Sequence, residues 1–120
     1  MKDYYNLIVE LSLQECKKED YCDKKKLRAH NAAALKLFKL RPEMKQYDCD
    51  EILRRLLSHE DDRVKNNAGA ICLYNDVIPD EAEIVLKNVM ESSSDPTLRF
   101  SAEMILKLKG GKIKTLDELK

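Results

Sequence analysis

The predicted fold is decided by the stretch Asp61-Asp62-Arg63-Val64-Lys65-Asn66-Asn67-Ala68. An acidic N-cap opens a helix, a β-branched residue and a cation follow, and an alanine lies on the buried face. The same order returns 34 residues later, at Asp95-Pro96-Thr97-Leu98-Arg99-Phe100-Ser101-Ala102. Such an internal repeat predicts helical hairpins that bury their apolar faces by stacking on one another.

Length and composition limit the classes of protein to consider. The chain has 120 residues, enough for one compact domain, and 43% of them are apolar, too many for a disordered chain. Its 22 cations balance 22 anions, whereas a nucleic-acid binder normally has a basic excess. Because no signal-peptide core follows Met1 and no apolar run could span a bilayer, we expect a cytoplasmic protein without membrane contact.

The first hairpin is expected over residues 2–41. Its first helix should run over residues 2–19, and its second from the N-cap Asp23 to Leu40, because Pro42 disfavours helix before it. The expected buried face of the first helix is Tyr4, Leu7, Ile8 and Leu11, and that of the second is Leu27, Asn31, Ala34, Leu35 and Phe38. Asn31 would then be a buried amide that satisfies the backbone of a nearby loop, an interpretation favoured over ligand binding.

Two further hairpins are expected over residues 48–75 and 79–110. Their four helices should begin near Asp48 or Asp50, at Asp61 or Asp62, at Pro79 and at Pro96, and Gly110-Gly111 should end the last one. Ala68-Gly69-Ala70 should let a neighbouring backbone approach closely. A short tail, 111–120, could add one turn with Thr115 and Glu118 at capping-box spacing.

The stretch from Leu56 to Ala70 resembles a HEAT-type repeat, in which an interhelical Asp precedes Val-Arg and an alanine. With Asn31 in an alanine-rich helix and the run 101–106, residues 20–111 are similar to a small bacterial family of all-α HEAT-like domains with no assigned function. Leu108 departs from that pattern, which has tryptophan there. The resemblance implies an α-α superhelix of about six helices in three stacked hairpins, and it implies no catalytic residue.

Three cations hold equivalent positions in the expected second helices: Arg28, Lys65 and Arg99. With Lys36 and Glu103, they could form a concave face that binds a partner. The alternative, which we favour, is a structural role in which Asp61, Asp62 and Asp95 cap helices and pair with these cations, as in Asp61–Lys65 and Asp95–Arg99.

Other polar clusters carry weaker signals. His59 lies beside Glu60, Asp61 and Asp62, but without metal-ligand spacing a solvated loop is favoured. The acidic group Asp76, Asp80, Glu81 and Glu83 could attract a basic partner, although solvated helix starts usually look like this. Cys16, Cys22, Cys49 and Cys72 show no CxxC spacing and are interpreted as reduced thiols rather than disulfides or metal ligands. No cofactor is expected.

These observations favour a non-enzymatic protein-interaction module of a bacterial cytosol, of which an immunity or antitoxin-like protein is one version. The alternative is nucleic-acid binding through the basic helix that contains Lys24-Lys25-Lys26. A small-molecule or metal-dependent enzyme is a third hypothesis, without a motif to support it. The partner's identity and the oligomeric state stay open.

Overall fold

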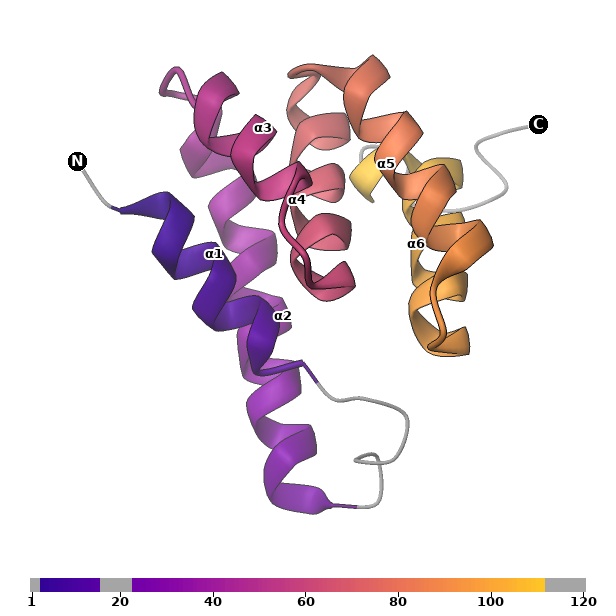
Figure 1. Ribbon diagram of the computed structural model, residues 1–120. Helices are drawn as coiled ribbons and strands as arrows, with labels where there is room; N and C mark the ends of the chain where they lie inside the picture. Colours follow the sequence, from indigo (N-terminus) through magenta and orange to yellow (C-terminus); the bar gives the residue numbers. More distant parts are fainter. Residues whose placement is uncertain (1–2, 16–22, 112–120) are drawn as a thin grey trace.

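Six α-helices make up the part of the chain that the computed structural model describes, residues 3–15 and 23–111 (Figure 1). They are α1 (Tyr4–Leu13), α2 (Lys24–Met44), α3 (Asp50–Leu57), α4 (Asp62–Asn75), α5 (Pro79–Ser92) and α6 (Pro96–Leu108), and a 3₁₀ turn, η2 (Lys109–Gly111), follows. These ranges contain no strand, which confirms the all-α prediction. The turn expected at Thr115 lies outside the described residues.

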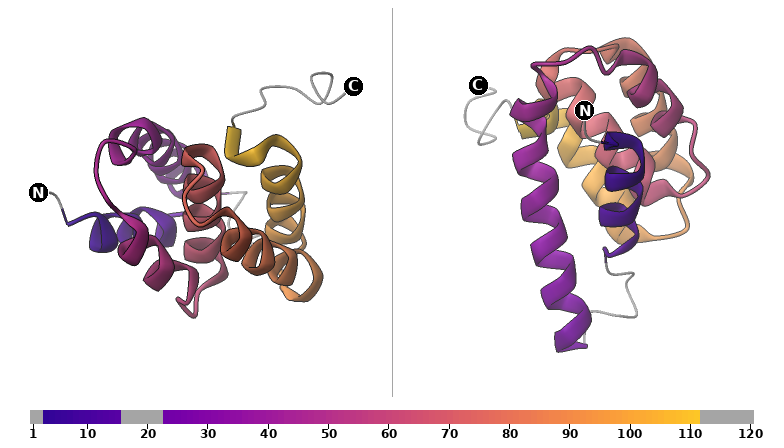
Figure 2. Two further views of the ribbon diagram at one scale, coloured as in Figure 1. Left: turned by 90° about the horizontal axis from the view of Figure 1, so that it is seen from above. Right: turned by 90° about the vertical axis from the view of Figure 1, so that its left-hand side faces the viewer.

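Helix α4 is central, because it contacts each of the other helices and η2. Seen from above, it lies between α2 and the α5–α6 pair (Figure 2). Val64, Ala68 and Ile71 are among its buried residues. Leu86 of α5 packs so closely on Gly69 that a Cβ added there would lie 2.7 Å from the Leu86 Cγ. The small-residue patch therefore allows the close helix packing expected of it.

The beginnings of α4, α5 and α6 are those expected from capping and proline signals. Asp61 accepts a hydrogen bond from the Arg63 N–H at 2.9 Å, and Asp95 accepts one from the Thr97 N–H at 2.8 Å. Pro79 and Pro96 occupy first helical positions, where a missing N–H leaves no helical bond unmade. Local sequence was therefore sufficient to locate these three helices, whereas Cys49, the N-cap of α3, makes no side-chain cap hydrogen bond.

Helix α1 is shorter than predicted. It ends at Leu13, so the prediction of helix is wrong for residues 14 and 15, and residues 16–19 lie outside the description. Arg63 of α4 donates hydrogen bonds to the carbonyls of Leu13 and Glu15, at 3.3 and 2.9 Å. This contact from a distant part of the sequence takes carbonyls that a longer helix would use itself.

Helix α2 differs from its prediction in both length and orientation. It continues through Pro42 to Met44, because Met44 is buried in the core and Arg41 is held by η2. The predicted buried face is wrong. The residues that α2 buries are Ala33, Leu37, Leu40 and Met44, whereas Asn31, Ala34, Leu35 and Phe38 are exposed and Leu27 is half-buried. Asn31 is thus not a buried amide.

We predict that Gly69→Ala destabilises the protein by about 1–3 kcal/mol, because the new methyl group overlaps Leu86. An ordinary glycine-to-alanine change within a helix has the opposite sign. Urea unfolding measures the effect. In a Leu86→Ala background, where space has been opened, the same change should stabilise; destabilisation in both backgrounds would contradict the packing argument.

Candidate functional site

The proposed concave-face residues do not share one environment. Arg28 and Lys36 are exposed on α2. Lys65 is half-buried and pairs with Asp62 at 3.7 Å, Arg99 donates to the Ser93 carbonyl at 2.7 Å, and Glu103 pairs with Lys107 at 3.1 Å. The expected pairs Asp61–Lys65 and Asp95–Arg99 do not form among the described residues. Of the five proposed concave-face residues, only Arg28 and Lys36 of α2 are exposed.

Asp61 instead belongs to a polar cluster that joins the end of α1 to the start of α4. Its carboxylate accepts from Arg63 Nη2 at 2.8 Å, and the Asn67 amide donates to Ser12 Oγ and to Glu15 Oε1, at 2.9 and 2.6 Å. The Arg63 hydrogen bond lowers the pKa of Asp61. Burial raises the pKa of Glu15 above its usual 4.5, although Asn67 and Arg63 oppose that shift. The cluster has a structural role, because its polar atoms form hydrogen bonds with one another and hold α1 against α4.

A second group of polar contacts holds the C-terminal end of α2. The Arg41 guanidinium lies 5.0 Å from the Phe38 ring centroid and 5.9 Å from that of Tyr74, and it donates to the Gly110 carbonyl. The Asn75 amide donates to the Arg41 carbonyl at 2.8 Å. Sequence reasoning missed Arg41, Arg63 and Asn67 because their partners lie far away along the chain, where periodicity gives no signal.

The buried amides of the structure are Asn66 and Asn75, rather than Asn31. Asn66 donates to the Leu98 carbonyl at 3.3 Å, joining α4 to α6. Their Oδ1 atoms and Arg41 Nε are buried without a hydrogen-bond partner among the described residues. Such groups weaken the core locally, and they belong to the helix–helix contacts already described.

The structure shows the surroundings of His59 and of two of the four cysteines, which the sequence left as weak candidates for metal binding. His59 Nδ1 accepts from the Asp61 backbone N–H at 3.0 Å, so His59 orders the loop before α4. Cys49 and Cys72 are buried free thiols, and burial raises the pKa of Cys72 to about 12. Cys16 and Cys22 lie outside the description. Within residues 3–15 and 23–111, no group of three His, Cys, Asp or Glu side chains is arranged to hold a metal ion.

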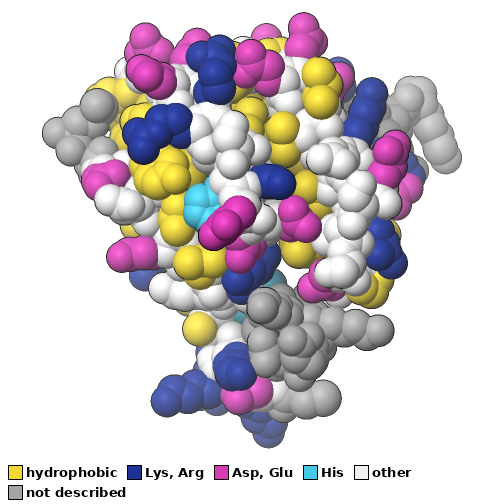
Figure 3. Space-filling view, viewed as in Figure 1, with side chains coloured by type: hydrophobic (Ala, Val, Ile, Leu, Met, Phe, Trp, Pro, Cys, Tyr) yellow, Lys and Arg dark blue, Asp and Glu magenta, His cyan; other side chains and the backbone are white. Residues whose placement is uncertain are grey.

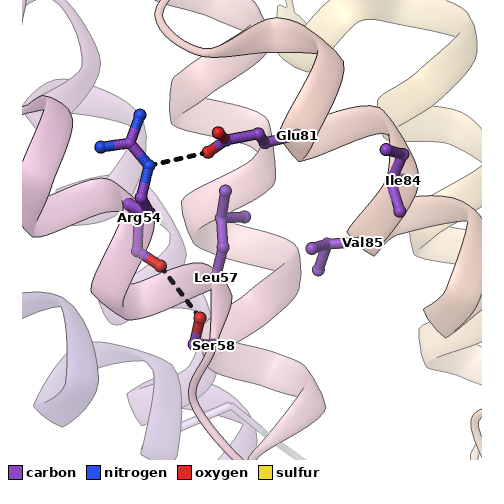
Figure 4. Close-up of a pocket in the computed structure, with 6 residues that line it drawn as sticks. All are labelled: Arg54, Leu57, Ser58, Glu81, Ile84 and Val85. Carbon is purple, nitrogen blue, oxygen red and sulfur yellow. Dashed lines mark hydrogen bonds and ion pairs between the residues drawn. The ribbon is translucent and has the colours of Figure 1, made fainter.

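Two shallow hollows lie between helices within the described part of the chain. One, of about 230 Å³, is lined by Leu57 at the end of α3, by Ser58 directly after it and by Ile84 and Val85 of α5, and the Arg54–Glu81 ion pair at 3.0 Å lies at its edge (Figure 4). The other, of about 240 Å³, lies between Leu7 and Leu11 of α1 and Lys36, Lys39, Leu40 and Glu43 of α2. Lys36 and Lys39, both exposed residues, therefore border this hollow. Both hollows can accept an apolar group, and neither collects a catalytic set of polar groups.

The most distinctive surface is the outer α2 face, which we define as Arg28, Asn31, Leu35, Phe38 and Lys39. All five residues are exposed, Leu35 by 56% and Phe38 by 51%. Lys24, Lys25 and Lys26 extend it to the protruding start of α2, where dark-blue side chains gather at the bottom of the view (Figure 3). Cations at a helix N-terminus oppose the helix dipole, so local stability does not explain them.

Comparison with known proteins finds no matching family model, no similar curated protein and no similar solved structure. Among the described helices, none is long and apolar enough to cross a bilayer.

We predict that Glu15→Gln stabilises the protein at neutral pH. Because the folded-state pKa of Glu15 is raised above 4.5, its carboxyl contributes most below that pH, and the contribution is lost as pH rises through the folded-state pKa. Glutamine keeps the acceptor for Asn67 without the buried charge. The difference in free energy of unfolding between variant and wild type should grow from pH 4 to pH 7, and a constant difference would count against the burial argument.

Asp61→Ala should lower the free energy of unfolding by about 1 kcal/mol, since it removes both a helix cap and the partner of Arg63. Asp61→Asn is the matched control, because asparagine caps a helix but does not pair with arginine as an anion. Thermal and urea unfolding should show that wild type is the most stable, Asp61→Asn is intermediate and Asp61→Ala is the least stable. Equal stability of Asp61→Ala and wild type would show that the cap is dispensable.

Proposed function

We propose that this chain is a non-enzymatic protein-binding module built as a HEAT-like stack of three helical hairpins. The contacts support the stack: α1 packs on α2, α3 on α4 and α5 on α6, while α4 packs on both α2 and α6. The proposed location is a bacterial cytosol, and the family resemblance supports its bacterial part. A toxin-blocking immunity protein is one concrete version, supported by the small size and the helical scaffold.

The observation that carries this proposal is the outer α2 face. Leu35 and Phe38 leave much of their apolar surface in water, and Arg28 and Lys39 flank them. Covering a leucine or phenylalanine fully is worth about 1.5–3 kcal/mol, so a partner that buries both gains appreciable affinity. The flanking cations favour a partner with apolar and acidic side chains, because opposite charges steer association.

Nucleic-acid binding is the second candidate, and the basic tip of α2 favours it. Lys24, Lys25, Lys26 and Arg28 are exposed together and could contact phosphates. However, the apolar residues on the same helix are better suited to a protein surface than to a phosphate backbone. Titration with duplex DNA at low salt separates the two: tight binding that weakens steeply with salt would favour this candidate.

We predict that Leu35→Asp abolishes capture of the native partner while leaving the fold intact, because Leu35 is exposed. The matched control is Phe100→Asp, which places the same charge at a residue of α6 that is 62% exposed. Affinity capture from native lysate should recover the same protein with wild type and Phe100→Asp, and little of it with Leu35→Asp. Equal recovery by all three would exclude the outer α2 face.

A further inference from the structure

The exposed faces of α2 and α5 are complementary when the two helices are aligned antiparallel. The aligned pairs are Arg28–Glu91, Asn31–Asn88, Ala32–Lys87, Leu35–Ile84, Lys36–Glu83 and Lys39–Asp80. Three pairs join opposite charges, one joins two amides and one joins two apolar side chains. Lys87, the one cation of α5, falls opposite an alanine, so no pair brings like charges together.

Helix geometry allows these residues to meet as two surfaces. On α2, residues 28, 31, 32, 35, 36 and 39 repeat at three- and four-residue intervals and so lie on one side of the helix, and residues 80, 83, 84, 87, 88 and 91 of α5 do the same. All twelve residues are exposed. Antiparallel helix pairs contact each other through residues at such three- and four-residue spacings. The α2 and α5 faces therefore match in the spacing of their residues as well as in residue type.

At the centre of the alignment, the hollow beside Ile84 has room for the Leu35 side chain. Ile84 is 69% exposed and lies at the rim of the hollow with Leu57 and Val85, while Leu35 is 56% exposed on α2 (Figure 4). A hollow of about 230 Å³ is larger than the roughly 150 Å³ cavity that accommodates benzene, so it can accept the Leu35 side chain. Apolar burial would then lie at the centre and ion pairs at the rim, as in stable interfaces.

The two faces cannot pair within one molecule, because α2 and α5 lie on opposite sides of α4 (Figure 2). We propose that the six aligned α2 residues of one copy of this chain, which include Arg28, Leu35 and Lys39 of the outer α2 face, pack antiparallel on α5 of a second copy. This inference rests on the proposed function in so far as both use α2 for binding. The contact is heterologous, so each copy keeps one free surface and the assembly grows head to tail. A chain with net charge zero does not resist such association.

Charge reversal on either face provides the test. Variant A is Arg28→Glu with Lys39→Glu, and variant B is Asp80→Lys with Glu91→Lys; all four positions are exposed, and none belongs to an ion pair within the described residues. Each variant alone has two faces of one sign and should stay monomeric. Mixed together, A and B should associate again, because the intact α5 face of A meets the intact α2 face of B with opposite charges and the two reversed faces are likewise opposite in charge, so chains of A and B alternate in the assembly.

Sedimentation velocity at about 0.05 M and about 0.5 M NaCl measures this, because salt screens the ion pairs. At low salt and about 0.1 mM protein, the wild-type mass should exceed the 13.9 kDa of one chain, and at high salt it should fall towards that value. The control variant, Lys45→Glu with Lys109→Glu, carries the charge change of A at exposed positions off both faces and should associate as wild type does.

A monomeric wild type at low salt, or a mixture of A and B that stays monomeric, would overturn the inference. In either case, affinity capture can still recover a different protein with wild type and not with Leu35→Asp. The proposed function then stands, and only self-association through α2 and α5 is excluded. If wild type associates but A does so equally well, the α2 face is not the contact, and the inference is again overturned. Circular-dichroism melting of every variant verifies that each is folded.

Discussion

The contact on which this fold depends is the close packing of small α4 residues against their neighbours. Leu86 of α5 occupies the space above Gly69, and a Cβ at Gly110 would lie 2.1 Å from the Ala70 carbonyl oxygen. Gly110 also has a φ of +71°, which favours glycine. Because a larger side chain at Gly69 would push α5 away and one at Gly110 would push η2 away, the arrangement around α4 depends on small residues at both contacts.

Two arginines then fix the periphery relative to this centre. Arg63 joins the start of α4 to the end of α1, and Arg41 joins α2 to η2 between the rings of Phe38 and Tyr74. Burial lowers the pKa of Arg41, so holding its charge there has an energetic cost. Both cations act within the fold and are poor candidates for contact with a partner. Among the exposed cations, Arg28 and Lys39 belong to the outer α2 face.

The surface of the molecule is therefore polarised although its net charge is zero. Exposed cations follow α2, and exposed carboxylates follow α5. Each helix also exposes a large aliphatic side chain, Leu35 on α2 and Ile84 on α5. A surface on which apolar and charged groups alternate in this way suits protein association. The proposed self-association uses both faces, and the proposed binding of another protein uses the α2 face.

Local signals in the sequence determined much of the architecture. Asp61, Asp95, Pro79 and Pro96 located the beginnings of helices, because a cap or a proline acts on the backbone within one turn. The sequence did not determine which side of α2 is buried, because two apolar stripes with helical spacing compete there. Only the tertiary structure decided that Leu37 and Met44 face the core, that helix continues through Pro42, and that Leu35 remains in solvent. The proposed binding surface consequently lies where the sequence predicted core, since burial is a property of the neighbours that a helix meets rather than of its own periodicity.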